Sequence, residues 1–150
     1  MRFLAAITAV SGLVGAAPTV QGAWDTSNVT VSGTNNTVYS FANSCNTYTV
    51  HQASGNVLLS AYCRDNTGAW PSRASQINLN HCIANNMGQM EAREDGYFGL
   101  SCNRMLFHGA QPILYAFCSN GHYPEETVLD VGNFLDNDDG RLRCFSYYGE

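Results

Sequence analysis

The sequence contains no lysine: all seven of its basic residues are arginines, and they stand against twelve acidic residues in a chain of 150. The formal net charge is −5, and no basic run interrupts the acidic balance. Nucleic acids and anionic membrane surfaces are therefore not expected as partners, because both are bound through clustered cations. Hydrophobic residues make up 45% of the chain and charged residues only 13%, which excludes wholesale disorder and indicates one folded domain.

Long apolar runs are also missing, apart from one at the N terminus. It begins after Met1-Arg2, extends from Phe3 to Ala17 and is followed by small or modest residues up to Gly22. The run is shorter than the roughly 20 residues that a membrane-spanning helix needs. We therefore predict a cleaved secretory signal peptide over residues 1–22, rather than a membrane anchor, and a secreted, extracellular protein.

Large apolar side chains are scarce in the following segment, residues 23–37, which is rich in Ser, Thr and Asn. This composition predicts an exposed arm ahead of the folded domain at residues 38–150. Asn28 and Asn35 each begin an Asn-x-Thr triplet, so both are candidates for N-glycosylation. Because such triplets also arise by chance, the sequence leaves the modification of either asparagine open.

The cysteines form no Cys-x-x-Cys pair, and no histidine cluster lies near two of them, so neither a zinc site nor another metal or cofactor is expected. An even number in a secreted chain predicts three disulfides instead, although six cysteines allow 15 pairings. The six are Cys45, Cys63, Cys82, Cys102, Cys118 and Cys144.

An internal duplication accounts for the spacing of four of these cysteines. Four blocks occur twice in the same order, which predicts two repeats over residues 38–93 and 94–150. The matched blocks are Phe41–Cys45 with Phe98–Cys102, Leu59–Cys63 with Leu114–Cys118, Ile77–Leu79 with Leu129–Val131, and Ile83–Met90 with Leu135–Leu142.

The repeat predicts one disulfide within each copy, Cys45–Cys63 and Cys102–Cys118. Cys82 and Cys144 fall outside the repeat, because the matching positions hold Phe134 and Ala92. Parity favours a third bridge between them that links the two halves. The alternative is that Cys82 is a buried free thiol, since it lies in an apolar block.

Period-two alternation indicates that the chain is mostly strand. Residues 57–63 place Leu59, Ala61 and Cys63 on one face, and residues 114–118 repeat that pattern. Turn dipeptides separate the strands, and only short helical turns are expected, around residues 80–84. The sequence therefore predicts a small all-β domain of triple-stranded units and hairpins. The turn dipeptides are Thr67-Gly68, Asp95-Gly96, Asn120-Gly121 and Asp139-Gly140.

The paired blocks resemble the cyanovirin-N homology family of lectins. The Phe-x-x-Ser-Cys opening, the apolar strand ending in Cys, and the Asn-x-x-Gly-x-apolar close each occur twice in the family order, from Val38 to Cys144. The resemblance implies a pseudo-symmetric all-β fold of two triple-stranded sheet plus β-hairpin units with exchanged segments. It also implies a lectin without catalytic activity or metal, which binds mannose-type oligosaccharides and favours α1-2-linked mannose.

By this resemblance, a first sugar pocket lies where the strand before Cys45, the loop after Cys63 and the Asn-x-x-Gly turn meet. Carboxylates and amides suit a sugar because they satisfy the hydroxyls that lose water on binding. Arg64 departs from the family pattern, which often has an acidic residue at this position. The alternative interpretation of Asp138-Asp139-Gly140 is a solvated hairpin turn without a role in binding. The implied residues are Ser40, Asn43, Ser44, Arg64, Asp65, Asn66, Thr67, Asn137, Asp138 and Asp139.

The resemblance implies a second pocket that departs further from the family pattern. Ala84, Met87, Leu100 and Gly121 stand where members carry charged residues, and apolar side chains accept no hydroxyl hydrogen bond. We therefore expect this pocket to be weak, with Tyr97 and Tyr123 available for stacking. Its polar and aromatic residues are Asn85, Tyr97, Ser101, Ser119, Asn120, His122 and Tyr123.

Two other functional classes stay open from the sequence alone. A secreted protein-interaction module on the same fold is the main alternative, since a fold does not fix a function. A glycoside hydrolase is less favoured, because its candidate carboxylates Glu125, Glu126, Asp138 and Asp139 are adjacent pairs in expected turns. The expected partners are oligosaccharides or glycoproteins. A monomer is favoured over a dimer that swaps segments through residues 92–97.

Overall fold

The computed structural model describes residues 40–71, 74–108 and 111–150, and throughout these ranges the protein is built from β-strands and short 3₁₀ turns. The expected signal peptide over residues 1–22, the arm over residues 23–37 and its asparagines Asn28 and Asn35 lie outside the described residues. Those assignments therefore stay predictions. Within the described ranges, no helix is long and apolar enough to span a membrane.

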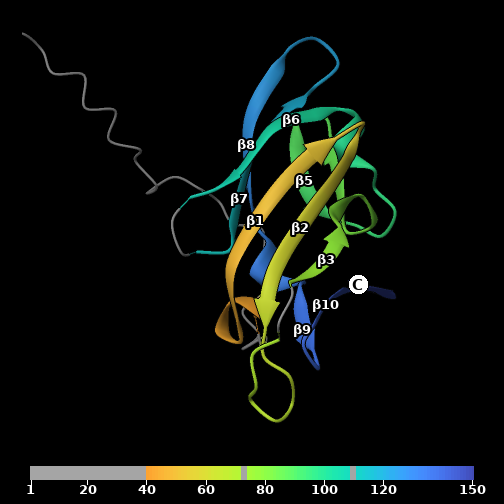
Figure 1. The fold of residues 1–150 in the computed structure, drawn as a ribbon. Helices are drawn as coiled ribbons and strands as arrows, with labels where there is room; N and C mark the ends of the chain where they lie inside the picture. The colour runs from red at the N-terminus through yellow and green to blue at the C-terminus, as the bar shows by residue number, and fades with distance from the viewer. Residues whose placement is uncertain (1–39, 72–73, 109–110) are drawn as a thin grey trace, which may run out of the picture.

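Each repeat forms one antiparallel three-stranded sheet (Figure 1). The first sheet contains β1 (Cys45–Ala53), β2 (Asn56–Cys63) and β3 (Ser75–Asn78), and the second contains β6 (Cys102–Phe107), β7 (Ile113–Ser119) and β8 (Pro124–Asp130). Each repeat then adds a hairpin: β4 (Ile83–Asn86) with β5 (Gln89–Ala92), and β9 (Asp136–Asp138) with β10 (Arg141–Cys144). A short strand, β11 (Tyr147–Tyr148), extends the second hairpin to three strands.

The two repeats exchange their hairpins, as the family resemblance implies. The β9–β10 hairpin of the second repeat packs against β2 and β3, and β5 of the first repeat packs against β8. One buried hydroxyl anchors each hairpin: the backbone N–H of Leu142 donates to Ser75 Oγ (3.0 Å), and that of Met90 donates to Thr127 Oγ1 (3.1 Å). These two contacts occupy equivalent positions in the duplication.

The core has the same internal symmetry. Phe41 and Phe98, Leu59 and Leu114, and Leu79 and Val131 are equivalent pairs, and all six side chains are fully buried. Disulfides join Cys45 to Cys63, Cys102 to Cys118 and Cys82 to Cys144, which confirms the three predicted bridges. The alternative of a free thiol at Cys82 is therefore wrong.

The described residues form four short 3₁₀ turns, whereas the sequence indicated short helical turns only around residues 80–84. Three of them begin at a side chain that accepts a backbone N–H, namely Ser40, Asn78 and Asp130. This capping stabilises a short turn without any helical periodicity, so a search for periodicity does not detect it. The turns are η2 (Phe41–Asn43), η3 (Leu79–His81), η4 (Phe98–Leu100) and η5 (Val131–Asn133).

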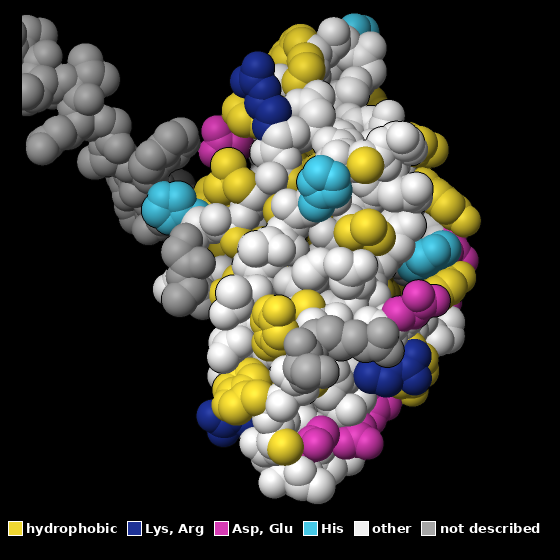
Figure 2. Space-filling view, in the orientation of Figure 1, with side chains coloured by type: hydrophobic (Ala, Val, Ile, Leu, Met, Phe, Trp, Pro, Cys, Tyr) yellow, Lys and Arg dark blue, Asp and Glu magenta, His cyan; other side chains and the backbone are white. Residues whose placement is uncertain are grey.

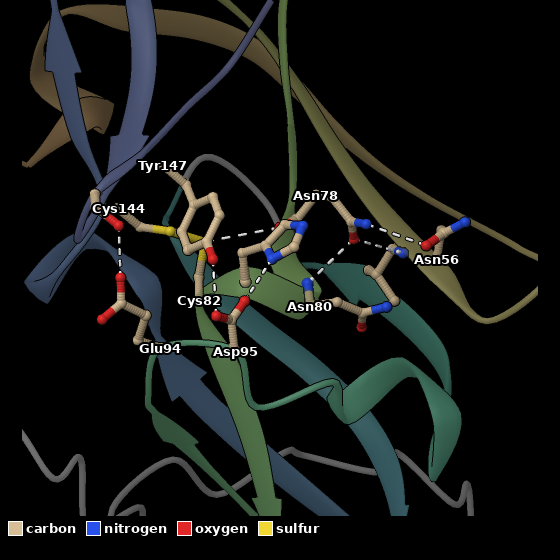
Figure 3. Close-up of polar contacts among 11 residues, drawn as sticks. Asn56, Asn78, Asn80, Cys82, Glu94, Asp95, Cys144 and Tyr147 are labelled. Atoms are coloured by element: carbon tan, nitrogen blue, oxygen red, sulfur yellow. Dashed lines mark hydrogen bonds and ion pairs between the residues drawn. A yellow bond between two sulfur atoms is a disulfide. The ribbon is translucent and has the colours of Figure 1, made fainter.

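The connection between the repeats is held by the C-terminal segment (Figure 3). The carboxylate of Asp95 lies 2.6 Å from His81 Nδ1 and accepts a hydrogen bond from the Tyr147 hydroxyl (2.7 Å). The rings of His81 and Tyr147 stack with their centres 4.2 Å apart. Ser146 donates to Glu94 (2.6 Å), and the Cys82–Cys144 disulfide lies beside this cluster. The connection is thus held to His81 of the first half and to Ser146 and Tyr147 of the second by polar contacts, while the disulfide joins the two halves beside it.

Candidate functional site

One asparagine joins the three segments that the family resemblance assigns to the first pocket. Asn137 Nδ2 donates to Ser44 Oγ (2.9 Å) and to the backbone oxygen of Arg64 (2.7 Å), and its Oδ1 accepts from the backbone N–H of Gly140 (2.9 Å). The backbone N–H of Arg64 also donates to Ser44 (2.8 Å). Both N–H groups of the amide and its oxygen are engaged within the protein, so Asn137 holds the three segments in place.

The loop after Cys63 is ordered by Asp65. Its carboxylate accepts hydrogen bonds from the Thr67 hydroxyl (2.6 Å) and from the backbone N–H groups of Thr67 and Ala69 (both 2.9 Å). The hydroxyl contact is the main cause that lowers the pKa of Asp65 below its ordinary value. Asp65 is therefore ionised at neutral pH and holds the loop in one conformation.

A direct contact joins that loop to the β9–β10 turn. The backbone N–H of Asn66 donates to Asp139 Oδ1 (2.9 Å), so the two segments meet although 73 positions separate them. Asp139 has a positive φ of 52° and begins the tight turn that Gly140, with φ of 84°, completes. The exposed side chains of Arg64, Asn66, Thr67 and Asp139 border this junction.

The structure places two of the ten residues expected in the first pocket away from this junction. Ser40 caps η2 through Ala42, and its hydroxyl lies against Gly132. Asp138 pairs with Arg143 (3.3 Å), because alternate side chains of β9 point to opposite faces and Asn137 faces the junction. Asn43 is exposed next to Ser44, and its backbone N–H donates to Ser40.

Sequence reasoning missed Trp70 as a neighbour of this junction. Its side chain is 45% exposed, and the Arg64 guanidinium lies 4.5 Å from its ring centre. The sequence signal that could have identified it is an aromatic residue in the short polar loop after Cys63. The β9–β10 turn also borders a hollow of about 470 Å³, whose lining includes no residue expected in the first pocket: Pro71, Ala74, Ser75, Gly140, Arg141 and Glu150.

The second expected pocket contains the same positioning amide. Asn85 Nδ2 donates to Ser101 Oγ (2.9 Å) and to the backbone oxygen of Ser119 (2.8 Å), and its Oδ1 accepts from the backbone N–H of Gly88 (2.8 Å). Each contact has its counterpart at Asn137. The duplication has therefore preserved the scaffold of both sites.

The loop of the second site is ordered by an amide where the first uses a carboxylate. Asn120 Oδ1 accepts from the backbone N–H groups of His122 (2.9 Å) and Tyr123 (3.0 Å), and its Nδ2 donates to Glu125 (2.7 Å). Glu125 is a positioning residue that the sequence did not reveal, because it lies five residues along the chain in β8.

The surface of the second site is largely apolar. Met87, Tyr97, Leu100 and Tyr123 are 71%, 49%, 76% and 61% exposed. Ala84, by contrast, is fully buried, and a Cβ on Gly96 would lie 2.5 Å from it. The inclusion of Ala84 in the lining of this pocket is therefore wrong, because the connection between the repeats covers it.

The CVNH domain family matches residues 41–143, which is more than two thirds of the chain. The chain belongs to the CVNH family. The Asn137 and Asn85 junctions both lie within the matched part of this CVNH chain. No match was found among curated protein sequences.

Solved structures with the same fold support the assignment. A designed cyanovirin-N homolog lectin is 25% identical, with a TM-score of 0.60, and the match covers 71% of this CVNH chain and 99% of that chain. The T. borchii CVNH is 24% identical, with a TM-score of 0.58 and coverage of 71% and 99%. A variant of MoCVNH3 in complex with (N-GlcNAc)4 is 16% identical, with a TM-score of 0.59 and coverage of 70% and 96%.

Proposed function

We propose that this CVNH protein is a secreted lectin that binds mannose-type oligosaccharides, with α1-2-linked mannose favoured, and that it catalyses no reaction. The observation that carries the proposal is the Asn137 junction, which holds three polar segments in fixed positions. The Asp139 carboxylate accepts from neighbouring sugar hydroxyls, and the exposed amide of Asn66 both donates and accepts. Groups that are fixed before binding lose little conformational freedom when the sugar arrives.

The family assignment supports sugar binding as the general activity. One structural neighbour is described as a lectin, and another was solved in complex with (N-GlcNAc)4. The preference for mannose rests on the resemblance and on the acidic and amide groups of the first site. The second site contributes little in this proposal, because its exposed Met87 and Leu100 offer no hydroxyl partner.

Titration of the purified, isotope-labelled protein with α1-2 mannobiose tests the proposal. We expect saturable changes in the amide resonances of Asn66, Asp139 and Gly140, with an affinity in the millimolar range, or about −4 kcal/mol. The Asn137→Asp variant should lose at least tenfold in affinity, because it removes the Nδ2 donor that fixes the junction. Asn85→Asp is the matched control at the second site and should leave this affinity unchanged.

The same titration separates the alternative functions. Cleavage of the mannobiose would contradict the proposal and favour a glycoside hydrolase. The absence of any resonance change with mannobiose and with branched oligomannose would contradict it in favour of a protein-interaction module.

A further inference from the structure

The two sheets of the duplicated fold have outer faces of opposite character. In the first sheet, one cross-strand row contains Thr49, Ser60 and Gln76, and the Gln76 amide donates to the Ser60 hydroxyl (3.0 Å). In the second sheet, the row in the same register contains Leu106, Tyr115 and Val128. Since the polar row supports the same fold, folding alone does not require the apolar row.

This apolar face contains a hollow rather than a flat surface. A cavity of about 320 Å³ is lined by Leu106, His108, Tyr115, Ala116 and Phe117, together with the charged residues Arg104 and Glu126. Leu106 is 48% exposed, and the rings of His108 and Tyr115 lie 6.0 Å apart. Figure 2 shows hydrophobic, Arg, acidic and His side chains together over the β7 and β8 region at the upper left.

The hollow continues toward the second candidate site. A neighbouring hollow of about 590 Å³ is lined by Asn103, Arg104, Phe117 and Pro124, so the two hollows share Arg104 and Phe117. Pro124 pairs with Ser119, which belongs to the second site. These two adjacent hollows beside β7, which share Arg104 and Phe117, are here together called the β7 groove.

The charges at the rim of the β7 groove fit a neutral ligand. The Arg104 guanidinium lies 5.7 Å from the centre of the Phe117 ring, and Glu126 pairs with Phe117 across the strands. Within residues 40–71, 74–108 and 111–150, neither Arg104 nor Glu126 takes part in an ion pair. One carboxylate and one guanidinium beside an aromatic floor provide hydroxyl partners without a net charge.

We propose that the β7 groove is a further oligosaccharide-binding site, specific for β1-4-linked chains whose rings carry equatorial substituents. Such sugar rings have a flat face of C–H groups that stacks on aromatic side chains, and their hydroxyls lie at the ring edge. Tyr115 provides an aromatic ring for one sugar, and Arg104, whose guanidinium lies over the Phe117 ring two residues along the same strand face, donates to the hydroxyls of the next sugar. The inference rests on the proposed lectin function but concerns a different surface and a different sugar geometry.

Titration of the labelled protein with tetra-N-acetylchitotetraose and, separately, with cellotetraose tests this site. We expect saturable changes in the amide resonances of Leu106, Phe117 and Glu126 with at least one of the two sugars. A response to chitotetraose alone assigns the N-acetyl group as part of the ligand, and a response to both assigns the shared glucose-type backbone. No response of these resonances to either sugar overturns the proposal.

The duplication provides the decisive variant, because Ser60 shows which residue the fold accepts at the position of Tyr115. Tyr115→Ser should reduce the affinity for the β1-4-linked tetrasaccharide at least tenfold and leave mannobiose binding at Asn66 unchanged. Glu126→Gln, which retains the shape of the groove, should weaken the same binding severalfold. Unchanged affinity in both variants overturns the proposal.

The outcomes distinguish this site from the proposed mannose site. Mannobiose changes at Asn66 without changes at Phe117 overturn the β7 groove alone. Changes at Phe117 with β1-4-linked sugar, without a mannobiose response at Asn66, support the groove and contradict the mannose assignment. If the amide resonance of Phe117 shifts as the protein concentration is raised in the absence of sugar, the groove binds a second copy of the chain, and the proposal is overturned.

Discussion

Asn85 and Asn137 occupy equivalent positions in the two repeats, and each uses three hydrogen bonds to hold segments that are remote in sequence. A single planar amide can do this because it presents donors and an acceptor in fixed directions. The surrounding residues have diverged, whereas these contacts have not. Site geometry and ligand chemistry are therefore determined by different residues.

Substitution of either asparagine by aspartate should destabilise the protein to a similar extent. The change replaces a donor with an acceptor that faces the backbone oxygen of Arg64 or Ser119. We expect a loss of about 1 kcal/mol in the free energy of unfolding for Asn85→Asp and for Asn137→Asp, because the amides are only partly buried. Denaturant unfolding measures both values, and a loss confined to one variant would contradict equivalent roles.

The loop at the first site should be sensitive to acid through Asp65. Its pKa in the folded protein lies below its ordinary value, chiefly because the Thr67 hydroxyl donates to the ionised carboxylate. The stability it contributes is therefore present above the unfolded-state pKa of about 3.9 and is lost as the pH falls through the folded-state value. Carbon-detected NMR titration of the carboxyl group should give a pKa below that of Asp65 in a Thr67→Ala variant.

At the scale of elements, the exchanged hairpins depend on two buried hydroxyls. Ser75 is 5% exposed and Thr127 is 3% exposed, and each accepts one N–H from a hairpin strand of the other repeat. Without that acceptor, a backbone N–H of β10 or β5 is buried without a partner. Such a group costs more than the net value of the hydrogen bond itself.

Ser75→Ala and Thr127→Val should each therefore lower the free energy of unfolding by about 1–3 kcal/mol. Thr127→Ser retains the acceptor and should lose less than Thr127→Val. Thermal or denaturant unfolding checks the order of the variants. Equal stability of Thr127→Val and the unmodified protein would show that the hydroxyl does not anchor β5.

The connection between the repeats should give Tyr147 an unusual titration. The hydrogen bond to the Asp95 carboxylate raises the pKa of Tyr147 to about 12. This contact contributes stability below about pH 10, the ordinary tyrosine value, and loses it as the pH rises through about 12. NMR of the Tyr147 ring should show the raised pKa, and Asp95→Asn should return it toward 10. A value near 10 in the unmodified protein would contradict the contact.

The elements differ in how far the sequence determined them. The strands around Leu59 and Leu114 were predictable, because period-two alternation directly reflects a sheet with one buried face. The 3₁₀ turns at Phe98 and Val131 were not, because they depend on one capping or left-handed residue each. Strand β11 was also missed, since it lies beyond the last matched block, which ends at Leu142, and has no counterpart to reveal it.

The candidate sites were predictable only through the resemblance. The repeat identified Asn137 and the loop after Cys63, but no pattern showed that Asp138 turns toward Arg143. That orientation follows from strand pleating, which requires knowing where β9 begins. The β7 groove was not predictable from the sequence, because the cross-strand row that joins Leu106, Tyr115 and Val128 is defined only by the register of the sheet.

For the whole molecule, the Cys82–Cys144 disulfide covalently joins the two halves. It closes a loop with a sequence separation of 62 residues, and both cysteines are buried. In the chain-entropy model, a loop of this length stabilises the folded state by about 4 kcal/mol.

The double variant Cys82→Ala with Cys144→Ala should lower the free energy of unfolding by about 4 kcal/mol. It should also favour dimers that swap segments through residues 92–97, because no disulfide then joins the two halves of the chain. Denaturant unfolding measures the first effect, and sedimentation velocity measures the second. Stability close to that of the unmodified protein would mean that packing of the hairpins alone holds the halves together.

The most direct measurement of where the protein holds its ligand is a set of intermolecular nuclear Overhauser effects in a complex with ¹³C-labelled α1-2 mannobiose. The account predicts contacts from the sugar protons to the side chains of Asn66, Thr67 and Asp139, which the Asn137 junction brings together. A complex in which the mannobiose contacts none of these three residues, or in which no contact forms at saturating sugar, would contradict it.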